Sequence, residues 1–334
     1  MLLLAVLYTA TVSGNAGCGR ELKNDTAIHS FAKGADIGWL SQMEDSGYIF
    51  KDSAGITKDC LDILKSYDIN SIRLRVWVNP VTRWCGTEDV VRQAVRAKNK
   101  GFRIMIDFHY SDWWADWSAQ KKPAAWTNDS FTRLLSDIYQ YTYHVMDTLK
   151  KSGVYPEWAE VGNEITHGML WPDGNTTHFN ELAQLINKGY EAVKAVSPST
   201  DVIIHLHDGG NNARYRGFFD SLTMNGGRFD IIGLSYYPGV NDWTESNEKI
   251  RFNLNDMAQR YQKPVMICET GMDYTADKAA KNMLTNLIGS VRLVPGGKGL
   301  GVFYWEPESY NWGYKLGAWN TNGKPTRAMD AFMQ

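Results

Sequence analysis

The feature that most constrains the fold is an alternation of short apolar runs with longer amphipathic stretches, which begins near residue 31 and continues to the C-terminus. Several runs are nearly continuous in Val, Ile, Leu and Met, as expected for parallel strands that pack together on one face and against helices on the other. The predicted strands are Ala32–Ile37, Ser71–Trp77, Phe102–Phe108, Glu157–Val161, Val202–Leu206, Ile231–Ser235, Val265–Cys268 and Leu300–Trp305.

The stretches between these runs have helical periodicity and recognisable ends. The clearest is Glu88–Lys100, which has acidic residues in its first turn and Gly101 just beyond its end. Thr87 is the expected N-cap of this helix. The other predicted helices are about Lys58–Tyr67, Ser130–Lys151, His178–Ala195, Asn212–Met224, Ser246–Tyr261, Ala276–Val291 and Thr326–Phe332.

Strands that are each followed by a helix, eight times in about 300 residues, indicate the α/β class. They favour a closed (β/α)₈ TIM barrel, with a single domain over residues 31–334. An open doubly wound sheet is the alternative, because the number of elements does not establish closure. No Gly-x-Gly-x-x-Gly motif follows the first strand, which weighs against a dinucleotide-binding fold.

Charge and aromatic content restrict the kind of partner. The 35 Lys and Arg residues nearly balance the 37 Asp and Glu residues, so the chain lacks the basic excess expected for binding nucleic acid or an acidic membrane surface. Aromatic residues make up 13% of the chain and include 13 Trp. Indole faces are apolar platforms with a polar edge, which predicts a surface that stacks flat ligands such as sugar rings. For any single Trp, packing in the core is the alternative.

The N-terminus has the pattern of an export signal. Residues 2–8 form an apolar run that is much shorter than the roughly 20 residues needed to span a bilayer, so we assign residues 1–17 as a signal peptide. The segment before Cys18 resembles a bacterial lipoprotein cleavage box, which would place a lipid on Cys18 and make residues 18–30 a tether. The expected location is then the bacterial outer membrane or cell surface, and a plain secretory signal cut near Ala16 is the alternative.

Two glutamates stand out at the ends of predicted strands, where barrel enzymes gather their catalytic groups. Glu164 and Glu269 each follow an apolar strand segment, and we expect them to face each other across the barrel mouth. Glycoside hydrolysis requires such a pair, since one carboxyl protonates the leaving oxygen and the other attacks the anomeric carbon or activates water. The alternative is a structural salt bridge between one of them and Arg73 or Arg75.

Seven sequence blocks then point to one family. They are Gly34–Ile37, Ile72–Trp77, Asp107–Asp112, Lys122–Trp126, Val161–Thr166, Gly168–Pro172 and Glu269–Thr270. In this order they resemble glycoside hydrolase family 53, the endo-β-1,4-galactanases, from about residue 31 to the C-terminus. The resemblance implies a monomeric (β/α)₈ enzyme without a cofactor, which would cut β-1,4-galactan side chains of pectin internally with net retention of configuration.

The resemblance also implies roles for individual residues. Glu164 would be the general acid/base and Glu269 the nucleophile, while Asn163 would bind the sugar 2-hydroxyl at the −1 subsite. Tyr236 would hydrogen-bond Glu269. Arg75 would do the same, with Arg73 as its rival because alternate strand residues share a face.

The remaining implied residues would shape the cleft. Asp107 and His109 would form the wall of the −1 pocket, and Trp305 its floor. Trp84, Trp114 and Trp171 would form rims or outer subsites, with core packing an open alternative for each of them.

The segment Thr270–Lys278 departs from the family pattern. Some bacterial members carry a calcium loop here, whereas this segment is short and has two acidic residues. Calcium takes roughly six to eight oxygen ligands, so we expect no metal at this position. The other cysteines, Cys60, Cys85 and Cys268, match no metal-ligand spacing, and Cys60 and Cys268 are expected to be small buried apolar groups.

Three other functions are compatible with the same residues. The pairs Asp107-x-His109 and His205-x-His207 each lie on one strand face and could serve a metal-dependent hydrolase, although the first strand offers only Asp36 as a further ligand. A surface galactan-binding protein without activity is the second. A barrel glycosidase acting on mannan, xylan or glucan is the third, since a fold does not determine a substrate.

Overall fold

The computed structural model describes residues 30–334. The predicted signal peptide, the lipid attachment at Cys18 and nearly all of the tether lie outside the described residues. Residues Phe31–Gln334 form one unit by their contacts. Within the described part, none of the helices has both the length and the apolar character needed to cross a membrane.

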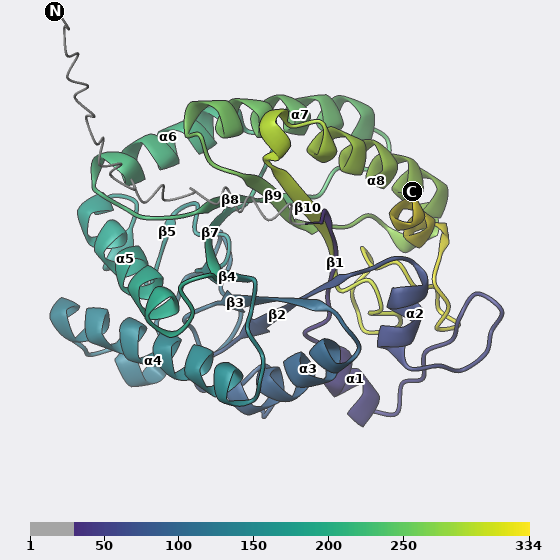
Figure 1. Ribbon diagram of the computed structural model, residues 1–334, viewed down its shortest axis with the longest axis horizontal. Coiled ribbons are helices and arrows are strands. Elements are labelled where there is room, and N and C mark those ends of the chain that lie inside the picture. The colour runs from purple at the N-terminus through teal and green to yellow at the C-terminus, as the bar shows by residue number, and fades with distance from the viewer. Residues whose placement is uncertain (1–29) are drawn as a thin grey trace, which may run out of the picture. The chain divides into compact units, whose positions relative to one another are not determined.

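Parallel strands close into a barrel, in which each strand pairs with the next one along the chain and the last pairs with the first (Figure 1). The strands are β1 (Ala32–Asp36), β2 (Ser71–Val76), β3 (Arg103–Phe108), β4 (Trp158–Val161), β7 (Asp201–Leu206), β8 (Ile231–Tyr236), β9 (Val265–Thr270) and β10 (Gly299–Trp305). The predicted TIM barrel is confirmed, and the open-sheet alternative is wrong because β1 and β10 are paired along their whole shared length.

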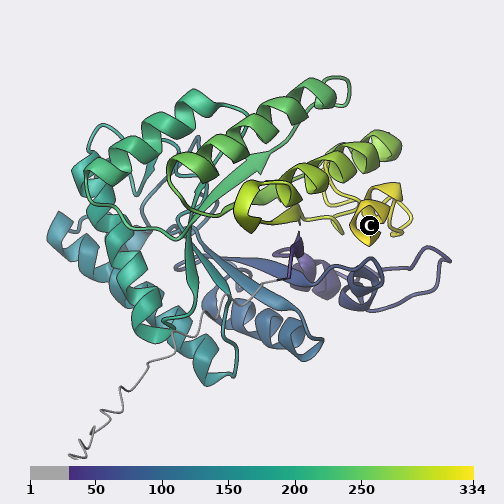
Figure 2. The same cartoon turned by 45° about the horizontal axis from the view of Figure 1, so that its top comes forward.

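Helices surround the barrel, as Figures 1 and 2 show. They are α1 (Leu40–Asp45), α2 (Cys60–Ser66), α3 (Thr87–Asn99), α4 (Phe131–Lys151), α5 (Phe179–Val196), α6 (Asn212–Met224), α7 (Trp243–Arg260) and α8 (Asp277–Arg292). A small antiparallel pair, β5 (Gly168–Met169) and β6 (Gly174–Asn175), lies in the loop after β4. The 3₁₀ helices are η1 (Ala124–Trp126), η2 (Tyr274–Ala276), η3 (Pro295–Gly297) and η4 (Arg327–Met333).

Two predictions of local structure are wrong. Thr87 is the first residue of α3 rather than its N-cap; Gly86 occupies the cap position, and no side chain caps the helix. The last predicted helix, Thr326–Phe332, is the 3₁₀ helix η4. The sequence patterns also missed α1 and the β5–β6 pair, because both are too short to show a period.

Strand alternation separates two buried clusters. One contains the residues that face the helices, and the other consists of strand residues that fill the barrel interior. The interior residues are Ala32, Met105, Trp158, Ile203, Ile231, Met266, Cys268 and Phe303. Every second residue of a strand shares its face, so this layer determines which side chains further along each strand point into the barrel mouth.

One interruption of the alternation is important for the site. Met266 and Cys268 face the interior, so a regular strand would turn Glu269 outward. The pairing of β8 with β9 shifts at this point: Leu234 lies opposite Ile267, and Ser235 opposite Glu269. This bulge adds one residue to β9, and Glu269 therefore points into the barrel as well.

We predict that Gly34→Ala destabilises the barrel. A Cβ atom at Gly34 would lie 2.1 Å from the Phe303 ring, which is fully buried, so the interior would have to shift. The expected loss in the free energy of unfolding is about 1–3 kcal/mol, measured by urea titration.

The control for this substitution is Gly217→Ala on α6. A Cβ at Gly217 meets no atom within 4 Å, and Ala in a helix interior should stabilise by roughly 0.5–1 kcal/mol. The combination of Gly34→Ala with Phe303→Leu should recover part of the loss. Equal stability of Gly34→Ala and the parent would contradict this packing.

Candidate active site

A buried arginine on β2, Arg73, organises the barrel mouth. Its Nε and Nη2 donate to the two oxygens of Glu160, at 2.9 and 2.7 Å. Its Nη1 donates to Asp36 at 2.7 Å and to Glu269 at 2.8 Å. Asp107 is a further ionic partner, at 3.0 Å. One guanidinium therefore contacts four carboxylates from four different strands.

The charges around Arg73 shift the pKa values of Arg73, Glu160 and His205. Burial acts to lower the pKa of Arg73, but the carboxylates raise it well above its ordinary value. Burial likewise acts to raise the pKa of Glu160, and Arg73 together with His205 outweighs burial and lowers it. Burial disfavours the charged form of His205, yet Glu160 raises its pKa overall.

Asn163 is fixed by this network. Its Oδ1 accepts hydrogen bonds from Arg73 Nη2 at 3.0 Å and from His205 Nδ1 at 3.1 Å. Its Nδ2 donates to the Ala115 carbonyl at 2.9 Å. The amide can face only one way, and one Nδ2 hydrogen has no partner among these contacts.

Glu269 receives one donor on each of its oxygens. Arg73 Nη1 binds Oε1 at 2.8 Å, and the Tyr237 hydroxyl donates to Oε2 at 2.9 Å. Burial raises the pKa of Glu269 overall, although Arg73 and His205 act to lower it. Two donors that both favour the carboxylate form orient this group as a base or nucleophile.

The predicted partners of Glu269 are corrected in both cases. Tyr236 faces outward with the rest of its strand face, and its hydroxyl donates to Asn247 on α7. Tyr237 is one residue further along, so it lies on the inner side. Arg73, the rival of Arg75, makes the contact with Glu269.

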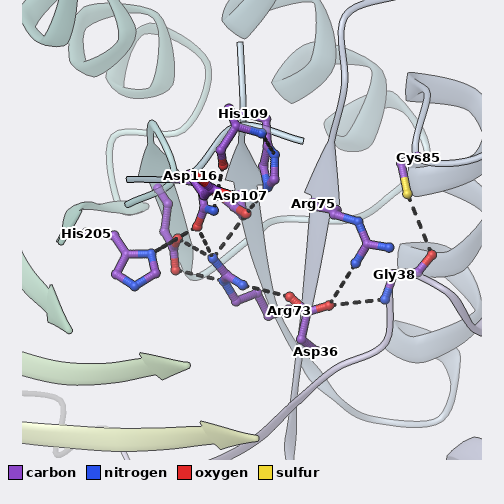
Figure 3. A network of polar contacts seen from close by, with 12 residues as sticks. Asp36, Gly38, Arg73, Arg75, Cys85, Asp107, His109, Asp116 and His205 are labelled. Atoms are coloured by element: carbon purple, nitrogen blue, oxygen red, sulfur yellow. Dashed lines mark hydrogen bonds and ion pairs between the residues drawn. The ribbon is translucent and has the colours of Figure 1, made fainter. Parts of the chain in front are cut away.

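Arg75 instead supports the aromatic part of the site. It forms an ion pair with Glu306 and lies 3.5 Å from Asp36. Figure 3 shows Arg73 and Arg75 reaching Asp36 from opposite sides. The Arg75 guanidinium lies 4.3 Å from the centre of the Trp114 ring. Arg75 is thus a support beneath Trp114 and makes no contact with Glu269.

Glu164 occupies a different environment from Glu269. It follows β4 with φ of +45°, after Gly162 at +90°, and these left-handed residues turn the chain sharply where the strand ends. Glu164 is buried, with 8% of the residue exposed. Burial, and then the negative charge of Glu269, raises the pKa of Glu164 to about 7. Glu164 therefore keeps its proton up to neutral pH.

Both glutamates line one cavity of about 420 Å³, which we call the central cavity. Of the other residues predicted for the site, it is lined by Asn163, His109, Trp114 and Trp305. The charge of Glu269 acts on the pKa of Glu164, so the two carboxyl groups are electrostatically coupled. A carboxylic acid and a carboxylate that share a cavity can protonate one atom of a ligand while attacking another.

Asp107 lies behind His109 rather than in the wall. Asp107 is fully buried and contacts His109 Nε2 at 2.9 Å. His109 Nδ1 accepts the Ala115 backbone N–H at 3.1 Å, so a neutral His109 carries its proton on Nε2. Asp107 therefore orients His109, and His109 is the member of the pair that lines the cavity.

The aromatic wall includes residues that the sequence patterns missed. Trp39 packs edge-on against Trp305 and Trp114, with ring centres 5.0 and 5.7 Å apart. The ring centres of Tyr314 and Trp305 are 4.7 Å apart. All four line the central cavity. Trp39 and Tyr314 lie in loops after β1 and β10, where no periodic pattern identifies them. The one sequence signal available for Trp39 and Tyr314 was that each lies in the segment after a predicted strand.

Two of the predicted tryptophans lie elsewhere. The Arg83 guanidinium lies 4.3 Å from the centre of the Trp84 ring. Trp84 lines a separate pocket beside α1 and α3, so its prediction as a cleft residue is wrong. Its ring is largely buried, as the core-packing alternative supposed. Trp171 donates from Nε1 to the His167 carbonyl at 2.9 Å and does not line the central cavity.

The histidine pairs behind the metal-hydrolase alternative have other partners. His205 contacts Glu160 at 3.2 Å and Ser235 at 2.8 Å, while His207 stacks on Trp117. Across residues 30–334, no three His, Cys, Asp or Glu side chains are grouped as metal ligands would be. The expectation of no calcium in Thr270–Lys278 stays a prediction. Cys60, Cys85 and Cys268 are buried free thiols.

Comparison with known proteins connects this site to one family. The model of glycosyl hydrolase family 53 matches residues 32–282. A protein of Niallia circulans described as uncharacterized is 37% identical over 309 residues, which cover 83% of this chain and 84% of that protein. A probable arabinogalactan endo-β-1,4-galactanase A of Aspergillus terreus is 35% identical over 299 residues, which cover 82% of this chain and 85% of that protein. A solved structure from a study of two fungal β-1,4-galactanases has a TM-score of 0.84 at 27% identity, covering 90% of this chain and 98% of its own.

We predict that Tyr237→Phe changes the apparent pKa of Glu269 and that Tyr236→Phe does not. Loss of the Tyr237 hydroxyl removes a hydrogen bond to the charged carboxylate, worth about 1.5–3 kcal/mol, so the apparent pKa of Glu269 should rise by about one to two units. Tyr236→Phe should leave that pKa unchanged. Carbon-13 NMR titration of the glutamate carboxyls measures both, with Glu269→Gln assigning the signal. A larger shift in Tyr236→Phe would contradict the structure.

Proposed function

The chain belongs to glycosyl hydrolase family 53, and we propose that it is an endo-β-1,4-galactanase that cleaves galactan or arabinogalactan chains internally. The names of its relatives support this activity. The observation that carries the proposal is the central cavity, which is lined both by Glu164, whose pKa is raised to about 7, and by the doubly hydrogen-bonded Glu269. The rings of Trp114, Trp305 and their neighbours suit the apolar faces of sugars.

We propose a double displacement with net retention of configuration. Glu164 gives its proton to the glycosidic oxygen as the bond to the anomeric carbon breaks, and Glu269 attacks that carbon to form a covalent glycosyl–enzyme. Water then donates a proton to Glu164 and attacks the anomeric carbon, which releases Glu269. This retaining mechanism requires the two carboxyl groups to lie roughly 5–5.5 Å apart.

The coupling of the two glutamates suits both half-reactions. In the free enzyme the charge of Glu269 helps to keep the proton on Glu164. When Glu269 forms an ester its charge disappears, so the pKa of Glu164 falls and the group becomes available as a base. One residue can thus serve as acid and then as base at the same pH.

Asn163 is suited to recognise the sugar at the cleaved bond. The Nδ2 hydrogen that has no partner among its protein contacts is available for the 2-hydroxyl. Because Arg73 and His205 fix the amide, binding requires no rotation of the side chain. A contact to the 2-hydroxyl that strengthens in the transition state contributes to rate as well as to affinity.

The polymer substrate is consistent with export. We propose that the enzyme acts outside the bacterial cytoplasm on the galactan side chains of pectin, held at the cell surface through a lipid on Cys18. A polysaccharide of this size must be shortened before uptake, which an internal cleavage achieves. The proposal rests on the pattern of residues 1–18.

We predict that Glu269→Ala abolishes cleavage of linear β-1,4-galactan, because no group remains to form the glycosyl–enzyme. Glu164→Ala should slow galactan cleavage by about 10²–10⁴-fold. It should slow an aryl β-galactobioside with an acidic leaving group much less, since that departure needs no proton. Reducing-end release and steady-state kinetics measure both. Near-parental turnover by Glu269→Ala would show the assignment to be wrong.

We predict a pH profile with an alkaline limb that belongs to Glu164. Its pKa is raised to about 7, so the protonated acid is present below that pH and is lost as the pH rises through it. The kcat/KM for galactan should therefore fall above about pH 7. With the aryl galactobioside, Glu164→Gln should show no such fall. If this variant kept the alkaline limb, another group would be responsible.

A further inference from the structure

Two buried carboxyl groups, Glu306 and Glu308, lie just after β10, and the chemistry proposed above uses neither of them. Both side chains are fully buried. Glu306 directly follows Trp305, with a left-handed φ of +46°, at the point where the strand ends. An ionised carboxylate is costly to bury unless a cation or hydrogen-bond donors compensate it. The partners of each group therefore indicate what it does.

Glu306 is connected to three aromatic residues of the central cavity. It forms an ion pair with Arg75, which lies beneath Trp114. Its two oxygens accept the Trp39 backbone N–H, at 3.1 and 3.2 Å. Trp305 is its neighbour in the chain. A change in the position of Glu306 would therefore reach most of the aromatic wall.

Arg75 carries the effect of Glu306 to the rings. Its guanidinium carbon lies 4.3 Å from the centre of the Trp114 ring and 5.3 Å from that of Trp39. Its Nε and Nη2 are buried and have no hydrogen-bond partner among the described residues. A cation within about 6 Å of an indole face is attracted to it, so the rings are the partners of this side of Arg75. The ion pair with Glu306 restricts where the cation can lie against the two indoles.

Glu308 differs from Glu306 in its partners. Neither of its oxygens accepts a hydrogen bond from another residue in the described part of the chain. Its side chain does lie within hydrogen-bond reach of Glu306. A proton on Glu308 would remove the buried charge and would let its O–H donate to Glu306, so both groups would be satisfied.

The electrostatics of the pair agree with this arrangement. Burial, and then the charge of Glu306, raises the pKa of Glu308 well above its ordinary value. Burial also raises the pKa of Glu306 overall, although Arg75 acts to lower it. The pair therefore retains a proton near neutral pH. The Trp39 N–H and Arg75 already donate to Glu306, so the proton belongs to Glu308.

We propose that Glu306 and Glu308 are a positioning pair for the reaction, in which Glu306 holds Arg75 and Trp39 in place and the neutral Glu308 donates a hydrogen bond to Glu306. Neither carboxyl group lines the central cavity, so the pair acts through the aromatic wall and without contact to substrate. The inference rests on the proposed galactanase function, because that wall is the surface offered to the sugar.

The first test is a double-substitution cycle of Glu306→Gln with Trp114→Ala. The readout is kcat/KM for linear β-1,4-galactan, at a temperature where far-UV circular dichroism shows every variant to be folded. Gln keeps the shape of Glu306 but loses the charge that holds Arg75, so kcat/KM should fall at least about tenfold in the parent. In Trp114→Ala the further fall should be less than about threefold, because the ring through which Glu306 acts is already absent.

This cycle separates positioning from simple stabilisation. A residue that only stabilises the fold leaves kcat/KM of the folded enzyme unchanged. Parental kcat/KM in folded Glu306→Gln, or an equal loss with and without the Trp114 ring, would therefore overturn the proposal.

A pair of substitutions at Glu308 tests the donor. Glu308→Leu removes the hydrogen bond to Glu306 and should lower kcat/KM about threefold to tenfold. Glu308→Gln offers an amide N–H to the same carboxylate, so it should restore most of that loss. If Gln cost as much as Leu, Glu308 would not act as a neutral donor and the proposal would be wrong.

Gly38→Ala displaces Arg75 without a change to either carboxyl group, and it gives an answer even if Glu306→Gln does not fold. A Cβ atom at Gly38 would lie 2.2 Å from Arg75 Nη1, so the guanidinium beside it must move (Figure 3). The kcat/KM of this variant should also fall at least about tenfold, and far less in Trp114→Ala. Parental kcat/KM in folded Gly38→Ala would overturn the proposal.

The parent enzyme distinguishes the two possible failures. If it does not cleave linear β-1,4-galactan, the galactanase function itself is wrong. If it cleaves galactan and its kcat/KM is insensitive to Glu306→Gln and Gly38→Ala, only the positioning pair is wrong.

Discussion

The structure depends on one buried cation. Arg73 lies inside the barrel without access to water and forms ion pairs with Asp36, Asp107, Glu160 and Glu269. Removal of one partner from a buried ion network leaves uncompensated charge, at a typical cost of about 3–5 kcal/mol. The barrel strands must therefore hold their register around this group. The same register determines where Glu269 can point.

The catalytic difference between the two glutamates follows from what each one contacts. Glu269 accepts hydrogen bonds from Arg73 and Tyr237, and both of these contacts favour its ionised form. Glu164 has no cation bound to it in this way, and burial beside a negative neighbour keeps it protonated. The site thus separates an acid from a nucleophile by surroundings alone, although the two side chains are chemically identical.

Much of this could be predicted from the sequence, and the exceptions have physical causes. Parallel strands buried on both faces appear as apolar runs, so the barrel and the glutamates at its strand ends were predictable. Tyr236 was wrongly predicted as a partner of Glu269 because that prediction depends on which strand face is internal, and a run that is apolar on both faces does not show which face that is. Arg73 and Arg75 share a face, so only the register with neighbouring strands distinguishes them. Trp39 and Tyr314 lie in loops, where no period exists.

The central claim is that Glu269 forms a covalent bond to the sugar at the site that Arg73 organises. A 2-fluoro β-galactobioside with a good leaving group slows release of the glycosyl–enzyme and allows it to accumulate. Intact-protein mass spectrometry followed by peptide mapping should then find one added fluorogalactobiosyl group, on Glu269. A label on another residue, or continued turnover without any label, would contradict the account.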